Sequence, residues 1–207
     1  PEKVIDLAKL YWTHVPPEGE RYYPISDIDH YFGIEHISQD YFPASAYQTP
    51  TYILLGANLY KTLDFIIEFS NYAAEKYVNS SLAENEYEAV PVWISEETYT
   101  AQYMSNRLWC VYRGTQVNSD ILESISMALE KFLIERGKNT PNETLEKILL
   151  SILSRSNSAI LTSIVVSVVT ALPDKTFNVA KVLLRTKELF LYDTSRYVLD
   201  WTHKTQL

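Results

Sequence analysis

The chain has 207 residues, of which 46% are hydrophobic and 13% aromatic. This composition is sufficient for a sizeable hydrophobic core and excludes an intrinsically disordered chain. The net charge of −8 argues against a general affinity for nucleic acid, which depends on neutralising phosphates. The longest apolar run, residues 159–172, is shorter than the roughly 20 residues that cross a bilayer.

Charge and tyrosine are distributed unevenly along the chain. Residues 1–106 hold 5 basic and 16 acidic side chains, whereas residues 107–207 hold 13 and 10. Of the 16 tyrosines, 13 lie before residue 106. Tyrosine offers amphipathic contact area, so the acidic first half is a candidate partner surface. Half-buried tyrosines between helices would produce the same pattern.

The start of the chain, its glycines and its cysteine also bear on function. The chain begins at Pro1 rather than at a methionine, and its five glycines form no phosphate-binding loop. The single Cys110 cannot form an internal disulfide, which fits a reducing compartment. We therefore expect a cytoplasmic piece of a larger protein that has no enzymatic activity, cofactor or metal of its own.

Helical periodicity dominates the first 80 residues. The predicted elements are, in order, a helix over residues 4–15, one helical turn near 26–31 within an irregular stretch, a short helix over 49–57 and a helix over 60–78. The last of these has two apolar faces, which indicates neighbours on two sides.

Between residues 87 and 103, the spacing of the apolar residues changes from the helical period to alternation. Every second residue is apolar at Val90, Val92 and Ile94, and the same alternation returns at Tyr99, Ala101 and Tyr103. This pattern predicts a small β-hairpin. We expect residues 1–207 to form a single helical-repeat region, with a sub-boundary near 80–105 as the alternative.

Helices resume after the hairpin. They are predicted over residues 105–112, 119–137, from Thr140 onward, over 156–172 and over 173–185, with Thr186 and Thr194 as caps of the last ones. Thr140 and Glu143 are spaced as in a capping box. Residues 156–172 are rich in β-branched side chains, so a buried helix and a central strand both remain open there.

Short connections between amphipathic helices favour stacked helical hairpins. We therefore expect a mainly α fold, an irregular α-solenoid of the HEAT or armadillo kind, with one small β-hairpin near 87–103. The sequence contains no convincing fixed repeat period.

Four segments resemble the helical part of very large bacterial ATP-binding proteins, similar to STAND-type NTPases of antiphage defence. They are YFPASAYQTP at 41–50, RLWCVYRGTQ at 107–116, SNSA at 156–159 and LRTKELF at 184–190. The resemblance implies a sensor or scaffold segment beside a nucleotide-switching module, within a parent protein that is an NTPase. No G-x-x-x-x-G-K-[ST] loop is present, so ATP binding is not assigned to any residue of this chain.

One loop gathers potential metal ligands within ten residues. They are Asp27, Asp29, His30, Glu35 and His36. Imidazole and carboxylate together suit zinc or iron. Adjacent residues such as Asp29 and His30 diverge by about 100° on a helix, which favours a solvated loop with capping aspartates.

Cys110 and the basic residues of the second half are the other chemical candidates. All four histidines are remote from Cys110 in sequence, so we interpret it as a buried hydrophobe rather than a nucleophile. Eight basic residues are candidates for a phosphate-binding strip: Arg107, Arg113, Arg155, Lys175, Lys181, Arg185, Lys187 and Arg196. Helix-terminal and surface charges are the simpler interpretation. Lys181 and Arg185 are predicted to share a helix face.

The sequence favours a non-enzymatic helical-repeat domain that makes protein contacts. The residues expected to bind a partner are Tyr41, Tyr47, Tyr52, Lys181 and Arg185. A regulatory module that binds nucleic acid or nucleotide through the basic half is one alternative. A metal-dependent enzyme that uses the loop from Asp27 to His36 is the other.

Overall fold

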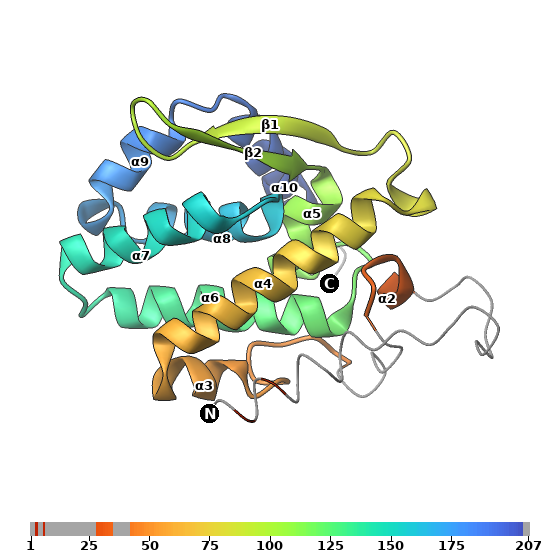
Figure 1. Ribbon diagram of the computed structural model, residues 1–207, viewed down its shortest axis with the longest axis horizontal. Helices are drawn as coiled ribbons and strands as arrows, with labels where there is room; N and C mark the ends of the chain where they lie inside the picture. Colours follow the sequence, from red (N-terminus) through yellow and green to blue (C-terminus); the bar gives the residue numbers. More distant parts are fainter. Residues whose placement is uncertain (1–2, 4–5, 7–27, 35–41, 205–207) are drawn as a thin grey trace.

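The computed structural model describes Lys3, Asp6, residues 28–34 and residues 42–204, which are mainly helical with one β-hairpin (Figure 1). In chain order the elements are α2 (Ile28–Tyr31), α3 (Thr51–Ala57), α4 (Leu59–Val78), η3 (Ser81–Ala83), β1 (Glu88–Trp93), β2 (Tyr99–Met104), α5 (Asn106–Cys110), η4 (Val111–Arg113), α6 (Asp120–Gly137), α7 (Asn142–Arg155), α8 (Ala159–Ala171), η5 (Pro173–Lys175), α9 (Phe177–Leu183) and α10 (Glu188–Lys204). The predicted elements near 26–31, 49–57, 60–78 and 87–103 are confirmed. Nearly all of the predicted helix over 4–15 lies outside the described residues.

Helix α8 is the centre of the hydrophobic core. It contacts α4, α5, α6, α7 and α9, and its residues from Ala159 to Val165 are all buried. A helix that is apolar on all sides is stable only when other elements surround it. The segment whose sequence left helix and strand open is therefore a helix.

The hairpin lies along one side of the helical body, over α7 and α8 (Figure 1). Its strands pair antiparallel from Glu88 opposite Met104 to Trp93 opposite Tyr99. Two isolated strands are marginally stable in water, and this pair rests on α7, α8 and α9. The buried amide of Gln102 donates to the Leu153 carbonyl at 3.2 Å and accepts from the Thr162 hydroxyl. These two bonds join β2 to α7 and α8.

Two of the predicted helix starts differ from the structure. The Thr140 hydroxyl donates to the Arg136 carbonyl at 2.8 Å, and Pro141 occupies the N-cap position of α7, so the capping box is wrong. Ser119 is the N-cap residue of α6, but its side chain makes no capping bond. A threonine hydroxyl that bonds back to a preceding carbonyl is no longer free to cap the next helix.

The C-terminal helices are divided differently from the prediction. The helix expected over 173–185 is split into η5 and α9, and the Thr176 hydroxyl between them donates to the Leu172 carbonyl at 2.9 Å. Thr194 lies inside α10 and caps nothing, because its hydroxyl donates to the Phe190 carbonyl at 2.7 Å. Gly114 ends η4 with φ of 60°, a left-handed conformation that favours glycine.

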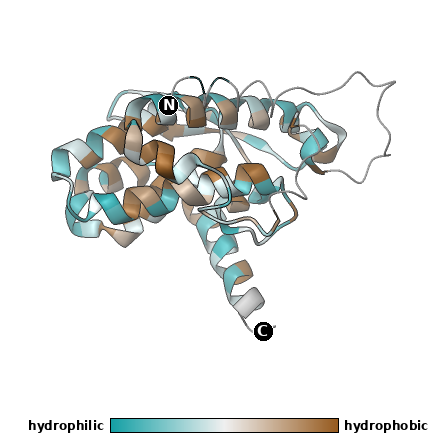
Figure 2. Ribbon diagram, turned by 90° about the horizontal axis from the view of Figure 1, so that it is seen from below, coloured by the Kyte–Doolittle hydropathy of each residue, from teal (hydrophilic) through white to brown (hydrophobic). Residues whose placement is uncertain are grey.

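Helix α10 extends beyond the helical body at its C-terminal end (Figure 2). It packs on α5, where Tyr192 near the start of α10 lies against Trp109. Within residues 28–34 and 42–204, no helix is long and apolar enough to cross a membrane.

Candidate partner-binding surfaces

Tyr47 and Tyr52 form a supported aromatic pair at the start of α3. Tyr47 is 65% exposed, and its ring centroid lies 5.2 Å from that of half-buried Tyr52, edge to face. Tyr52 packs edge-on against Phe132 of α6, with a centroid distance of 5.8 Å. The exposed ring thus rests on a ring that the core holds in place. Such support lowers the conformational entropy that Tyr47 would lose on binding a partner.

Two charged side chains of α6 complete this surface. Lys131 Nζ lies 5.5 Å from the Tyr47 ring centroid and 2.8 Å from Glu135 Oε1. The Tyr52 hydroxyl donates to Glu135. The hydrogen bond from Lys131, and to a smaller extent that from Tyr52, holds the pKa of Glu135 below its ordinary value, so this carboxylate stays ionised. We call Tyr47, Tyr52, Lys131 and Glu135 the α3–α6 aromatic surface.

The sequence located only part of this surface. Tyr47 and Tyr52 were predicted and are brought together, whereas Tyr41 lies outside the described residues. Lys131 and Glu135 were missed because Glu135 is 83 positions from Tyr52 in the chain. The only local signal for them was the spacing of four residues between a cation and an anion on one helix.

The eight basic residues considered for a phosphate strip all have partners within the chain. Five of them form ion pairs: Arg113 with Asp200, Arg155 with Asp64, Arg185 with Glu96, Lys187 with Glu188 and Arg196 with Asp193. Two donate hydrogen bonds to backbone carbonyls, Arg107 to that of Val117 and Lys175 to three others. The eighth, Lys181, lies over the Phe177 ring. A phosphate would have to compete with these contacts. The arrangement therefore favours surface and helix-terminal charges over a phosphate site.

Lys181 and Arg185 do not share a helix face, so this part of the prediction is wrong. Helix α9 ends at Leu183, and the chain then turns toward the hairpin. Arg185 lies beyond the helix and pairs with Glu96 in the hairpin loop, at 2.9 Å. Lys181 stays on α9, with Nζ 5.0 Å from the Phe177 ring centroid.

The candidate metal loop is described only in part. Asp29 is fully buried in α2, so the expectation of a solvated loop is wrong at this position; His30 beside it is exposed, and the two diverge as neighbours on a helix do. Asp27, Glu35 and His36 lie outside the described residues. Among the residues that the structure does describe, no three His, Cys, Asp or Glu side chains are grouped to hold a metal ion.

Cys110 is fully buried at the end of α5, in agreement with its interpretation as a small core residue. Burial raises the pKa of its thiol. A reactive cysteine needs a lowered pKa and access to solvent. This thiol has neither.

Helix α10 presents an apolar surface that sequence reasoning missed. Its exposed positions within 188–202 are Phe190, Leu191, Thr194, Tyr197, Val198, Trp201 and Thr202, none of which is charged. The five apolar side chains among them are between 52% and 68% exposed. We call Phe190, Leu191, Tyr197, Val198 and Trp201 the α10 stripe. Their recurrence every three or four residues was the signal available in the sequence.

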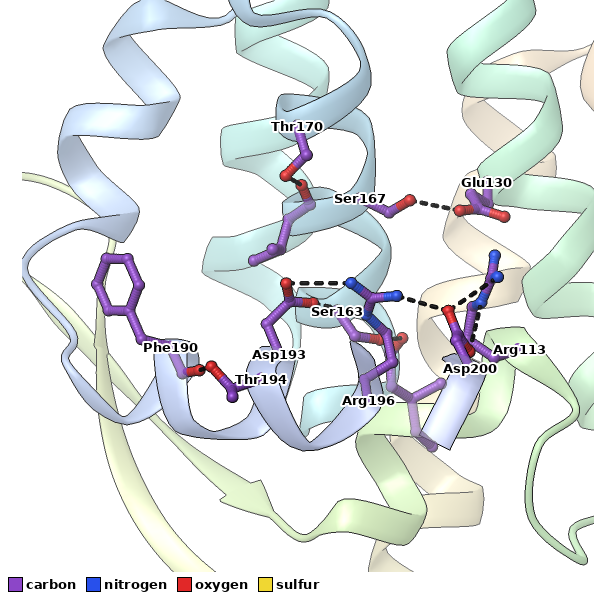
Figure 3. A network of polar contacts seen from close by, with 12 residues as sticks. Arg113, Glu130, Ser163, Ser167, Thr170, Phe190, Asp193, Thr194, Arg196 and Asp200 are labelled. Atoms are coloured by element: carbon purple, nitrogen blue, oxygen red, sulfur yellow. Dashed lines mark hydrogen bonds and ion pairs between the residues drawn. The ribbon is translucent and has the colours of Figure 1, made fainter. Parts of the chain in front are cut away.

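A row of ion pairs ties α10 to the rest of the molecule (Figure 3). Arg196 donates two bonds to Asp193, at 2.7 and 3.2 Å, and one to Asp200, at 2.7 Å. Asp200 also pairs with Arg113, at 3.0 Å. Asp193 raises the pKa of Arg196, so the guanidinium stays charged. Nearer the start of α10, the Tyr192 ring stacks on the buried Trp109 of α5, with centroids 5.8 Å apart.

Comparison with protein-family models and with curated proteins finds no match for this chain. The surfaces described above are therefore the basis on which its function is inferred.

Proposed function

We propose that this chain is a non-enzymatic helical domain that binds a protein partner through the α3–α6 aromatic surface. The observation that supports this most is Tyr47, which is exposed and yet held against Tyr52 and, through it, against the core. Aromatic side chains with rigid support are frequent anchors of protein interfaces.

Charge defines the kind of partner. The surface carries an ionised Glu135 beside the exposed ring, and residues 1–106 are strongly acidic. Lys131 adds one positive charge at the same place. A basic or mixed-charge protein element is complementary to this surface. Lysine and arginine side chains can also stack on exposed tyrosine rings.

The setting and the architecture are part of the same proposal. The resemblance of four segments to STAND-type proteins favours a scaffold or sensor region of a larger bacterial ATP-binding protein of antiphage defence. Short connections from α3 to α4 and from α6 through α7 to α8 favour an irregular α-solenoid of the HEAT or armadillo kind. The central place of α8 makes any such stacking irregular.

Selection of peptides from a displayed random library against the whole chain tests the proposal. We expect enriched peptides that contain lysine or arginine, and we expect their affinity to fall about tenfold or more for Tyr47→Ala. Tyr60→Ala is the matched control, because Tyr60 is equally exposed but lies outside the surface. Far-ultraviolet circular dichroism checks that both variants keep their helices.

Two results would contradict the proposal. One is that the selected peptides bind Tyr47→Ala as tightly as the unchanged chain. The other is salt-dependent binding of DNA or RNA with no peptide enriched, which would favour the nucleic-acid alternative.

A further inference from the structure

Helix α10 reverses the usual arrangement of a surface helix. Its charged residues Glu188, Asp193, Arg196 and Asp200 are all partly buried, whereas every exposed position in residues 188–202 is uncharged. A surface helix ordinarily turns its charges to water and its apolar side inward. Exposed apolar patches of this kind mark sites of association.

The inward side of α10 is held firmly, so the α10 stripe cannot turn into the core. Arg196 is bonded to Asp193 and Asp200, and Asp200 reaches Arg113 outside the helix. Tyr192 stacks on Trp109, and its hydroxyl donates to Glu88 at 2.7 Å. Among the described residues, the five side chains of the α10 stripe stay more than half exposed.

The stripe is complementary to itself. Alternating steps of four and three residues, the spacing of a coiled-coil seam, connect Phe190, Thr194, Tyr197 and Trp201. Leu191 and Val198 lie beside this seam. In an antiparallel pair centred between residues 195 and 196, Phe190 faces Trp201 of the second copy. Thr194 then faces Tyr197 of the second copy. Because the pair has two-fold symmetry, each of these contacts occurs twice.

We propose that α10 pairs antiparallel with α10 of a second copy of this chain, through the α10 stripe. This dimer goes beyond the proposed partner-binding function and does not depend on it, because the α3–α6 aromatic surface takes no part.

The area of the stripe and its lack of charge suit a second copy. The chain carries a net charge of −8, but the stripe itself brings no like charges together. It offers roughly 550 Å² per copy, so a pair would bury about 1,100 Å², near the lower limit of specific interfaces. We therefore expect a reversible dimer. A membrane surface is a poorer occupant, because helices that lie on membranes carry lysine and arginine on their polar face, where α10 has mainly acidic residues.

Sedimentation velocity over a concentration series from about 1 to about 300 μM measures the association. We expect a monomer–dimer equilibrium for the unchanged chain. Tyr197→Glu places two carboxylates near the centre of the pair and should weaken the dimer about tenfold or more. Tyr60→Glu, at an equally exposed helical tyrosine, should leave it unchanged. Trp201→Ser is a second disrupting variant if Tyr197→Glu fails to fold.

Cysteine cross-linking tests the antiparallel direction. Thr194 and Thr202 are both exposed, and each hydroxyl bonds to the carbonyl four residues before it. In the antiparallel pair the two copies of residue 194 are separated by about 4.5 Å along the axis, and those of residue 202 by about 20 Å. Thr194→Cys should therefore form a disulfide-linked dimer under mild oxidation, and Thr202→Cys should not. The buried native Cys110 provides no competing thiol.

Three results would overturn the proposal. A chain that stays monomeric throughout the series leaves the stripe to a different partner. A dimer that Tyr197→Glu or Trp201→Ser leaves intact has another interface. Equal cross-linking of Thr194→Cys and Thr202→Cys excludes the antiparallel arrangement. Tyr47→Ala should remain dimeric, so failure of the dimer and failure of the proposed function can be told apart.

Discussion

The Arg113 guanidinium lies 3.0 Å from the Asp200 carboxylate, which joins the turn after α5 to the C-terminal helix across 87 positions of sequence. The same carboxylate accepts from Arg196, so one acidic side chain is shared by two cations. Asp200 and Arg196 are the least exposed members of this network. Their burial makes the network more important for stability than an ion pair in water.

Removal of Arg196 should loosen α10. Arg196→Met leaves Asp193 without its cation and Asp200 with Arg113 alone, so we expect a loss of roughly 2–3 kcal/mol in the free energy of unfolding. Urea denaturation measures it. Arg185→Met is the control, because its partner Glu96 is exposed and the pair should contribute under about 1 kcal/mol. Equal losses for the two variants would contradict the prediction.

Glu123 should make the stability depend on pH. Burial, with Asp120 adding repulsion, raises its pKa to about 8 from 4.5. Below pH 4.5 this carboxyl is protonated both folded and unfolded, and its contribution to stability is fully present. As the pH rises from 4.5 toward 8, Glu123 ionises in the unfolded chain but stays protonated in the folded one, so stability falls by about 1.4 kcal/mol per pH unit at most; the loss is complete once the pH has passed the folded pKa of about 8.

The variant Glu123→Gln isolates this effect. It should be more stable than the unchanged chain above pH 8 and should flatten the profile between pH 5 and 8. Thermal unfolding at a series of pH values gives the comparison. Glu143→Gln, at an exposed glutamate in the first turn of α7, is the control and should leave the profile as it is.

Gln102 and Thr162 should be energetically coupled. Gln102→Leu deprives the buried Thr162 hydroxyl of its acceptor and the Leu153 carbonyl of a donor, at a cost of roughly 1–3 kcal/mol. Thr162→Val removes the same hydrogen bond from the other side. Because the two side chains share that bond, the double variant should lose less than the two single variants together. Additive losses in chemical denaturation would show that the residues act independently.

Cys110 should be unreactive in the folded chain. Its thiol is buried and its pKa is raised, so few thiolates are present and none is accessible. We expect Ellman's reagent to modify it only at the rate at which the chain opens, and promptly in urea. Rapid stoichiometric modification under native conditions would contradict the buried assignment.

The sequence alone determined those elements whose signals are local. The alternation of Val90 and Val92 predicted the hairpin, and the spacing of Ile121, Ile125 and Phe132 predicted α6. Both patterns report a side-chain period that the backbone itself imposes. Tyr47 and Tyr52 are close in sequence, so their meeting was also within reach of such reasoning.

Tertiary structure decided what depends on distant partners. Residues 159–171 are rich in β-branched side chains, but they form a helix because other helices enclose them and a helix satisfies its own backbone. The caps expected at Thr186 and Thr194 predicted helices in this part of the chain, and ordinary patterning would have turned their charges to water. Asp200 instead lies inward because Arg113, far away in the chain, pairs with it there. Together with the contacts of Tyr192 with Trp109 and Glu88, this long-range pair leaves the apolar side of α10 outside.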